Sequence, residues 1–191
     1  MNNKISVAVI GCSLSFSAVA AEQYTVDPRH TFPSFEVSHL GFSIQRGRFN
    51  ETAGKVTLDP ENNAGRIDVE IATDSISTGL AELEKHLRSP DFLDAARYPK
   101  ITFRSDKLTY KDGQLAAADG NLTMHGVTRP VRLTVDHFHC GLNLINLKNT
   151  CGANAVTVIK RSEFGVDAYL DLGLGDEVTV TIEGEFNQKA S

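Results

Sequence analysis

The sequence predicts an all-β protein with one antiparallel domain, built as a closed barrel or as a sandwich of roughly eight or nine strands. Three observations support this prediction. Apolar and polar residues alternate with the two-residue period of half-exposed strands along most of the chain. Short turn signals separate these segments, and no strand–helix–strand alternation indicates a parallel sheet. A barrel of about eight strands is favoured, because closure removes the sheet edges that so many consecutive strands would otherwise expose.

The expected strands follow one another through short turns. In chain order they lie at 24–26, 34–39, 49–58, 66–71, 100–110, 115–124, 130–135, 156–158 and 178–182. The clearest pattern is at 66–71, where Ile67, Val69 and Ile71 share one face. Asp112-Gly113 is the strongest short hairpin signal. The segment from Gly141 to Ala153 is expected to be a loop.

The one long segment without a strand pattern predicts a helical insert at about residues 79–96, near one mouth of the barrel. Leu80, Leu83 and Leu87 recur with the spacing of one helix face. Thr78 is a suitable N-cap, because its hydroxyl can accept from an unpaired first-turn amide. We expect the leucines to be buried against the strands.

The N-terminal segment, residues 1–21, has the features of a cleavable signal peptide. A short polar region with Lys4 precedes an apolar run at 5–19, and small residues around Ala20 suit cleavage. The run is short for a membrane span, so we expect export without stable membrane insertion. Lipid attachment at Cys12 is the alternative. Residues 22–191 would form the single domain.

Composition and the remaining cysteines narrow the classes further. The chain has 191 residues, 41% of them hydrophobic, a formal net charge of −5 and no tryptophan. No basic patch indicates nucleic acid as a partner. Cys140 and Cys151 would meet an oxidising compartment after export, and their spacing fits neither a redox motif nor a zinc knuckle, so a disulfide is expected.

Histidines are the only residues that suggest catalysis. His137 and His139 would lie on one strand face, a spacing that can hold a metal and that leaves a metal-assisted hydrolase as an alternative. No third ligand is evident, so ordinary surface histidines are favoured and no metal or cofactor is expected. The common serine-hydrolase, zinc-protease and phosphate-loop motifs are absent from the sequence.

Large apolar residues are spread over the strands and the insert, and they allow two interpretations of the barrel interior. They would form a packed core in a filled barrel, as in a stress-related exported protein, or they would line a cavity that holds a ligand. Periodicity does not separate the two. The residues expected to face the lumen are Phe35, Val37, Phe49, Phe92, Ile101, Phe103, Leu122 and Phe164.

Several separate blocks resemble the YceI-like family of exported bacterial proteins. The matching segments, in the order of the family, are His30 with Phe35–Gly41 and Gly47–Phe49, then Ser75–Thr78 with His86–Leu93 and Tyr98–Phe103, then Gly120–Val131, then Arg161–Gly165. Together they cover nearly all of the chain after residue 21.

The resemblance implies a lipocalin-like antiparallel barrel in the periplasm that binds an isoprenoid lipid, of the polyprenyl or quinone type, without catalysis. An isoprenoid chain of tens of carbons cannot cross an aqueous compartment alone, because each exposed CH₂ costs about 0.8 kcal/mol. A protein of this kind would act as a carrier. The oligomeric state, monomer or homodimer, stays open.

Overall fold

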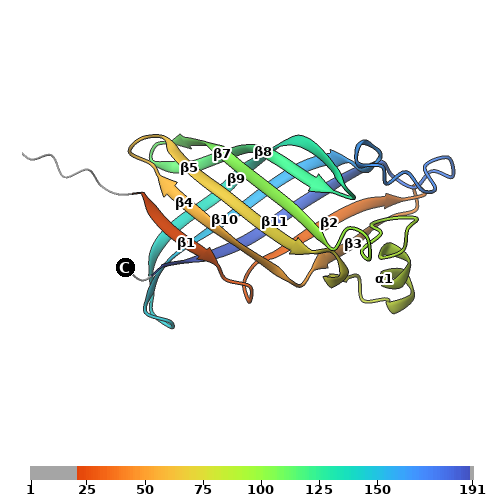
Figure 1. Ribbon diagram of the computed structural model, residues 1–191, viewed down its shortest axis with the longest axis horizontal. Helices are drawn as coiled ribbons and strands as arrows, with labels where there is room; N and C mark the ends of the chain where they lie inside the picture. The colour runs from red at the N-terminus through yellow and green to blue at the C-terminus, as the bar shows by residue number, and fades with distance from the viewer. Residues whose placement is uncertain (1–20, 190–191) are drawn as a thin grey trace, which may run out of the picture.

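The protein folds as a closed antiparallel barrel with one short helix at one end (Figure 1). The structure is a computed structural model and describes residues 21–189. The expected leader, apart from its last residue, and Cys12 lie outside the described residues. Among those residues, no helix combines the length and the apolar character needed to cross a bilayer.

The strands run along the chain with few interruptions. Their bounds are β1 (Glu22–Val26), β2 (Phe32–His39), β3 (Ser43–Phe49), β4 (Thr52–Asp59), β5 (Ala64–Ala72), β6 (Ile76–Ser77), β7 (Lys100–Lys111), β8 (Gln114–Met124), β9 (Val127–Asn143), β10 (Lys148–Lys160) and β11 (Glu177–Gln188). The helix α1 spans Ala81–Leu87, and short 3₁₀ turns lie at Thr73–Ser75 and Arg161–Phe164.

The hydrogen-bonding ladders show that some of these segments are parts of one strand, so that the barrel is an eight-stranded meander. β1 and β2 act as one long strand, because β1 pairs with β4 and β11 while β2 pairs with β3 and β11. In the same way, β3 and β4 form a second long strand with a break in it, and β5 and β6 form a third. The β1–β11 pairing closes the ring, which confirms the expected barrel and excludes the sandwich.

Alternation along each strand separates the two faces of the wall. On β9, the half-buried side chains of Val131, Leu133 and Val135 point inward and alternate with Arg132 and Thr134, which are exposed. The outer face carries cross-strand ion pairs such as Lys100–Glu70 at 2.6 Å and Arg132–Asp119 at 2.7 Å. Exposed pairs of this kind contribute at most about 1 kcal/mol each, so the interior carries the stability.

One end of the barrel, called the packed end below, is filled by side chains. Its cluster of buried residues comprises Tyr24, Val56, Leu58, Phe103, Leu108, Leu115, Ala118, Cys151 and Phe186. The ring of Tyr24 meets the ring of Phe186 edge-on at 5.5 Å. The described chain begins, at β1, and ends, at β11, at this end of the barrel (Figure 1).

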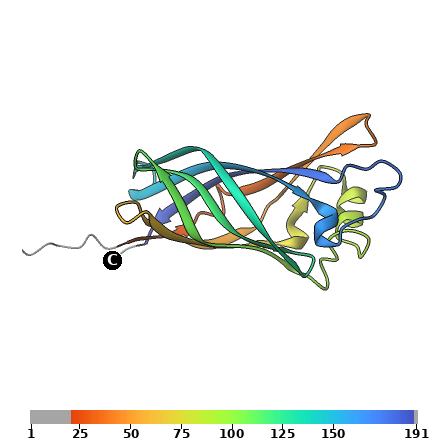
Figure 2. The same cartoon turned by 90° about the horizontal axis from the view of Figure 1, so that it is seen from above.

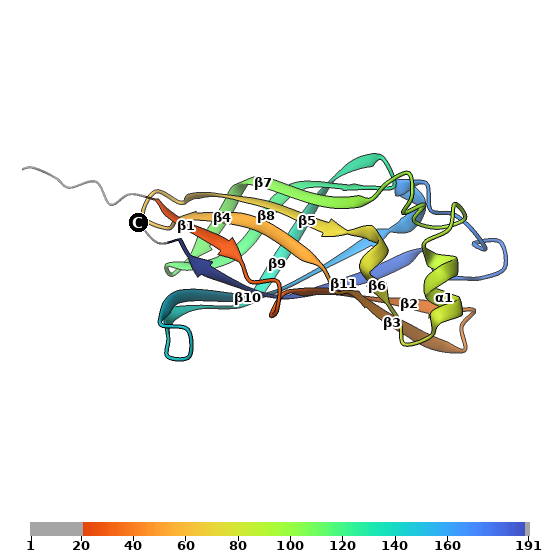
Figure 3. The ribbon, with the colours of Figure 1, turned by 60° about the horizontal axis from the view of Figure 1, so that its bottom comes forward.

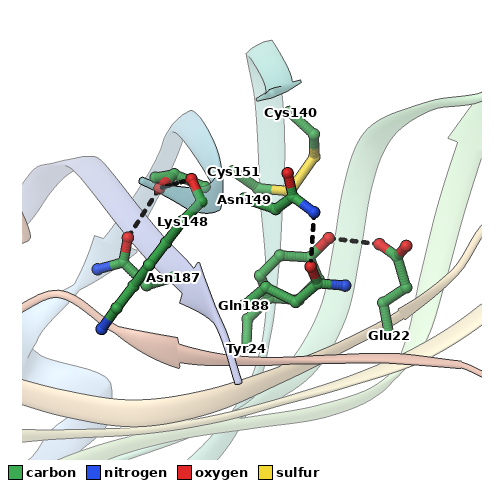
Figure 4. The surroundings of a disulfide bond; sticks show 9 residues. Glu22, Tyr24, Cys140, Lys148, Asn149, Cys151, Asn187 and Gln188 are labelled. Carbon is green, nitrogen blue, oxygen red and sulfur yellow. Dashed lines mark hydrogen bonds between the residues drawn. A yellow bond between two sulfur atoms is a disulfide. The ribbon is translucent and has the colours of Figure 1, made fainter. Parts of the chain in front are cut away.

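The disulfide lies at the packed end. Cys140 and Cys151 are joined, as expected, and face each other across the β9–β10 ladder (Figure 4). The expected loop at 141–153 is wrong, because both strands continue past the cysteines to Asn143 and from Lys148. The loop residues therefore form a hairpin whose tip is exposed.

The opposite end, called the α1 end below, is covered by loops. The helix lies across it, and the β2–β3 hairpin extends beyond the barrel (Figures 2 and 3). Contrary to expectation, the leucines at and within α1 are not buried: the N-cap Leu80 is 54% exposed, and Leu83 and Leu87 are half-buried. The side chains of the insert that are buried come later, at Phe92, Leu93 and Ala95.

The start of α1 also differs from the expectation. The N-cap is Leu80 and has no side-chain cap, so the prediction of Thr78 is wrong. Instead, the Glu84 carboxylate accepts from the backbone N–H groups of Thr78 at 2.8 Å and Gly79 at 3.1 Å. A carboxylate from the first turn of the helix thus satisfies the amides that precede it.

Candidate ligand-binding site

An apolar cavity of about 180 Å³ lies inside the barrel. Its wall comes from every long strand, and the described residues expose no polar atom to it. The lining includes Val26, Phe35, Phe49, Val69, Ile71, Ile101, Phe103, Leu122, Val131, Leu133, Ala155, Thr157, Ile159, Val180 and Ile182. The lumen is therefore not filled by its own side chains, and its surface is apolar.

Two glycines make room for aromatic rings inside the wall. The ring of Phe35 lies over Gly47 on the paired strand, and a side chain at Gly47 would collide with it. Phe103 covers Gly120 in the same way, where an added Cβ would come within 2.7 Å of the ring. Both phenylalanines line the cavity, so these glycines determine how far the rings extend into it.

The packed end closes the floor of the cavity. Burial, and then the hydrogen bond that Tyr24 donates to the Glu22 carboxylate, raise the pKa of the Tyr24 phenol (Figure 4). The phenol therefore stays neutral, and its hydroxyl is satisfied at the edge of the barrel.

Five of the residues expected to face the lumen line the cavity: Phe35, Phe49, Ile101, Phe103 and Leu122. Phe35 and Phe49 lie on neighbouring parts of the wall, with ring centres 6.1 Å apart. Whether these side chains contact a ligand stays a prediction.

The other three expected residues lie outside the cavity. Val37 shares the inner face of β2 with Phe35 but lies further along the strand, toward the tip of the β2–β3 hairpin. Phe92 packs against His86 at 5.0 Å and Tyr169 at 6.0 Å, within the loops of the α1 end. Phe164 is 1% exposed, and its carbonyl lies 3.2 Å from Nδ1 of His125.

Much of the lining was missed at the sequence level, although the signal was present. Val131, Leu133, Val180 and Ile182 alternate within expected strands and line the cavity. Their pattern indicated an inward face, but aromatic residues were weighted above aliphatic ones. Ala155 lines it as well, but a small side chain gives no such signal.

One arginine organises the loops of the α1 end. Arg161 is 5% exposed and donates to the carbonyls of Gly175 at 2.8 Å, Val166 at 2.9 Å and Ala168 at 2.9 Å. Burial lowers the pKa of its guanidinium, which nonetheless stays charged at any ordinary pH. Arg161 therefore positions residues 165–176, called the 165–176 loop below, and does not face the cavity.

The histidine pair that suggested a hydrolase lies on the surface of the barrel. His137 and His139 are exposed on β9. Among the described residues, no third metal-ligating side chain gathers with them.

The fold and the cavity define the class: an antiparallel barrel with an apolar lumen of the kind that accommodates a hydrophobic molecule. A profile of the YceI-like domain matches residues 24–186, and the chain belongs to the YceI-like family.

Relatives of known sequence and structure agree with this assignment. Protein YceI of Salmonella arizonae is 38% identical over 174 residues, which cover 88% of this chain and 88% of that protein. The crystal structure of Burkholderia cenocepacia BcnA matches with a TM-score of 0.70 at 26% identity, over 84% of this chain and 98% of that chain. A polyisoprenoid binding domain from Saccharophagus degradans shares the fold, with a TM-score of 0.66 at 16% identity over 87% and 98% of the two chains.

Proposed function

We propose that the protein is a periplasmic carrier that holds the hydrocarbon chain of an isoprenoid lipid, polyprenyl or quinone in type, inside the barrel. The observation that carries the proposal is the cavity, whose exposed surface is entirely apolar among the described residues. Such a surface gains nothing from a polar ligand but binds hydrocarbon by removing it from water. The polyisoprenoid binding domain of Saccharophagus degradans, which shares the fold, supports the same class of ligand.

The size of the cavity limits how a long lipid would be held. About 180 Å³ is below the roughly 300–1,000 Å³ of common ligand pockets. The lumen would enclose one section of the chain, or widen around it. Burial of a dozen carbons would contribute about 10 kcal/mol gross, part of which offsets the cost of association.

Entry is proposed at the α1 end. The packed end is closed by large buried side chains, among them Tyr24 and Phe186. The α1 end is covered instead by the helix, the insert and the 165–176 loop, elements held by few ladder hydrogen bonds. The polar head group would remain at this end, since the lumen offers it no hydrogen-bond partner.

The test is native mass spectrometry of the protein purified from the envelope of its own organism. A stoichiometric adduct with the mass of an isoprenoid lipid is expected. Thr157→Phe would fill the lumen and should abolish the adduct, because Thr157 lines the cavity. Val158→Phe is the matched control, since Val158 is the next residue on β10 and is 56% exposed on the outer face.

Two results would contradict the carrier. The first is wild-type protein from its own envelope that yields no lipid on extraction. The second is an adduct that survives in Thr157→Phe at the wild-type level, which would place the lipid outside the lumen. Fractionation of the cells tests the periplasmic location separately.

A further inference from the structure

A group of metal-ligating side chains lies where the wall bends, and the backbone around it, at Val26, Thr31 and Glu185, borders the cavity. It forms where the chain bends between β1 and β2 and crosses β11. His30 Nδ1 is 3.2 Å from Asp27 Oδ2 and 3.8 Å from Glu185 Oε2. One ligand atom from each of the three residues lies within 4.8 Å of the others.

These separations suit a small divalent cation. Two donors bound at 2.0–2.2 Å to a tetrahedral zinc ion are about 3.4 Å apart. The two distances from His30 Nδ1, 3.2 and 3.8 Å, lie on either side of that value. An ion between the three atoms would take the place of the hydrogen bond between His30 Nδ1 and Asp27 Oδ2.

The carboxylate of Asp27 is already oriented for such a role. Asp27 is 5% exposed, and its Oδ1 accepts from the backbone N–H of Arg29 at 3.0 Å. Its Oδ2 faces His30 and receives a long contact from Asn187 at 3.3 Å. Hydrogen bonds to the outer oxygen of a ligating carboxylate are the usual support of a metal ligand.

The charge and chemistry of the group also favour a cation. The two carboxylates carry a charge of about −2, which a divalent ion would neutralise. Imidazole nitrogen with carboxylate oxygen is a donor set that zinc accepts, with water in the fourth position. Arg29, whose Nε lies 3.6 Å from Asp27 Oδ1, is 77% exposed and can turn away.

We propose that Asp27, His30 and Glu185 form a zinc-type cation site that ties the β1–β2 bend to β11. The bend is important for the wall, because Thr31 and Val26 on either side of it line the cavity. Thr31 already exchanges two hydrogen bonds of 3.1 Å with the backbone of Glu185. The Asp27 N–H also donates to the Glu185 carbonyl at 2.8 Å, and the ion adds a further tie at the same crossing, independently of any lipid.

The exposed pair on β9 provides the matched control. His137 and His139 offer two imidazoles but no third ligand among the described residues. A His137→Gln/His139→Gln double variant removes two surface histidines without touching the proposed site. His30→Gln and Glu185→Gln are the test variants, because both side chains are partly exposed, at 55% and 42%, and tolerate substitution.

The experiment uses protein expressed from the full sequence, freed of metal with a chelator and titrated with zinc chloride. Native mass spectrometry and calorimetry should show one zinc ion per chain. We expect His30→Gln and Glu185→Gln each to weaken binding at least about tenfold, and the double variant at 137 and 139 to bind as the wild type does. The thermal midpoint should rise with zinc in the wild type and the double variant alone.

Three results overturn the proposal: no zinc bound to the wild type, unchanged affinity in His30→Gln, or binding lost only in the 137/139 variant. Circular dichroism of each variant without metal confirms that the barrel is folded. Because the lipid is not part of the titration, a failure to bind zinc leaves the carrier proposal intact. Likewise, a failure to find bound lipid leaves the zinc-site proposal intact.

Discussion

The two ends of the barrel differ in how they are held together. At the packed end, long strands pair up to their last residues, and aromatic and aliphatic side chains fill the interior. At the α1 end, the strands lead into loops fixed by single polar groups such as Arg161 and Glu84. Ladder hydrogen bonds and core burial form a cooperative unit, whereas a loop held by one side chain can open by itself.

Exposed apolar side chains occur at both ends, so exposure alone does not distinguish them. Phe42, at the tip of the β2–β3 hairpin, is 87% exposed, and Ile145, at the tip of the β9–β10 hairpin, is 96% exposed. What differs is the interior behind each tip. The comparison suggests that one end provides stability while the other leaves the lumen accessible.

The largest expected effect comes from the packed end. Phe186→Ala removes a ring that is 7% exposed and meets Tyr24 edge-on. The free energy of unfolding should fall by about 3–5 kcal/mol, from lost burial plus the cavity left behind. Urea denaturation measures it. Phe42→Ala at the other end should cost less than about 0.5 kcal/mol, and equal losses in the two variants would contradict the comparison.

The next effect comes from the disulfide. Its cysteines are 11 residues apart, and on the chain-entropy account closing so short a loop stabilises by about 3 kcal/mol. Cys140→Ser/Cys151→Ser should lose at most this amount, because the β9–β10 ladder already holds the hairpin. Urea denaturation of the double variant, beside chemically reduced wild type, checks the value. A variant as stable as the oxidised wild type would show that the bond does not support the packed end.

These effects concern contacts that the sequence could largely predict. Ile101, Phe103 and Leu122 lie on strands with clean alternation, and the period of two assigns them to the inside once a barrel closes. The cysteine pair was predictable too, because the spacing excluded other roles. Local patterns determined these assignments, and the structure confirms the barrel and the disulfide, whereas β3 and the ends of β9 and β10 around the cysteines were not predicted.

What could not be predicted depends on where the wall ends and the loops begin. Val37 fits the inward-facing period of β2 as well as Phe35 does. It nevertheless lies beyond the cavity, because β2 extends past the end of the lumen. Phe92 and Phe164 are buried against loops, whose sequences show no regular alternation of apolar and polar residues. Asp27 and His30 are close in sequence, but Glu185 joins them only because β1 pairs with β11 to close the ring.

A local effect is expected from the arginine of the α1 end. Arg161→Met removes the hydrogen bonds to Gly175, Val166 and Ala168, and we expect a loss of about 2 kcal/mol, since water can reach part of the loop. Hydrogen exchange should speed up in the 165–176 loop and stay unchanged at the packed end. Arg129→Met is the control, because Arg129 is exposed and donates to one carbonyl, that of Glu163, at 3.1 Å. Faster exchange along all of β11 would mean that the two ends do not open separately.

The smallest expected effect is a pH dependence confined to the α1 end. Burial alone would raise the pKa of Asp176, but hydrogen bonds from the Ser162 backbone N–H at 2.9 Å and hydroxyl at 2.8 Å, with Arg161 nearby, hold the pKa below its ordinary value. A lowered pKa in the folded state stabilises the protein above the unfolded value of about 4, and this stabilisation is lost as the pH falls through the folded pKa.

Asp176→Asn should therefore weaken the protein by about 0.5–1 kcal/mol at pH 7 and flatten the decline of unfolding free energy below about pH 4. Urea denaturation at a series of pH values measures both. Asp171→Asn, in the same loop and exposed, is the control and should follow the wild-type curve. An Asp176→Asn curve parallel to the wild type throughout would mean that this carboxylate takes no part in holding the loop, and that Arg161 does so alone.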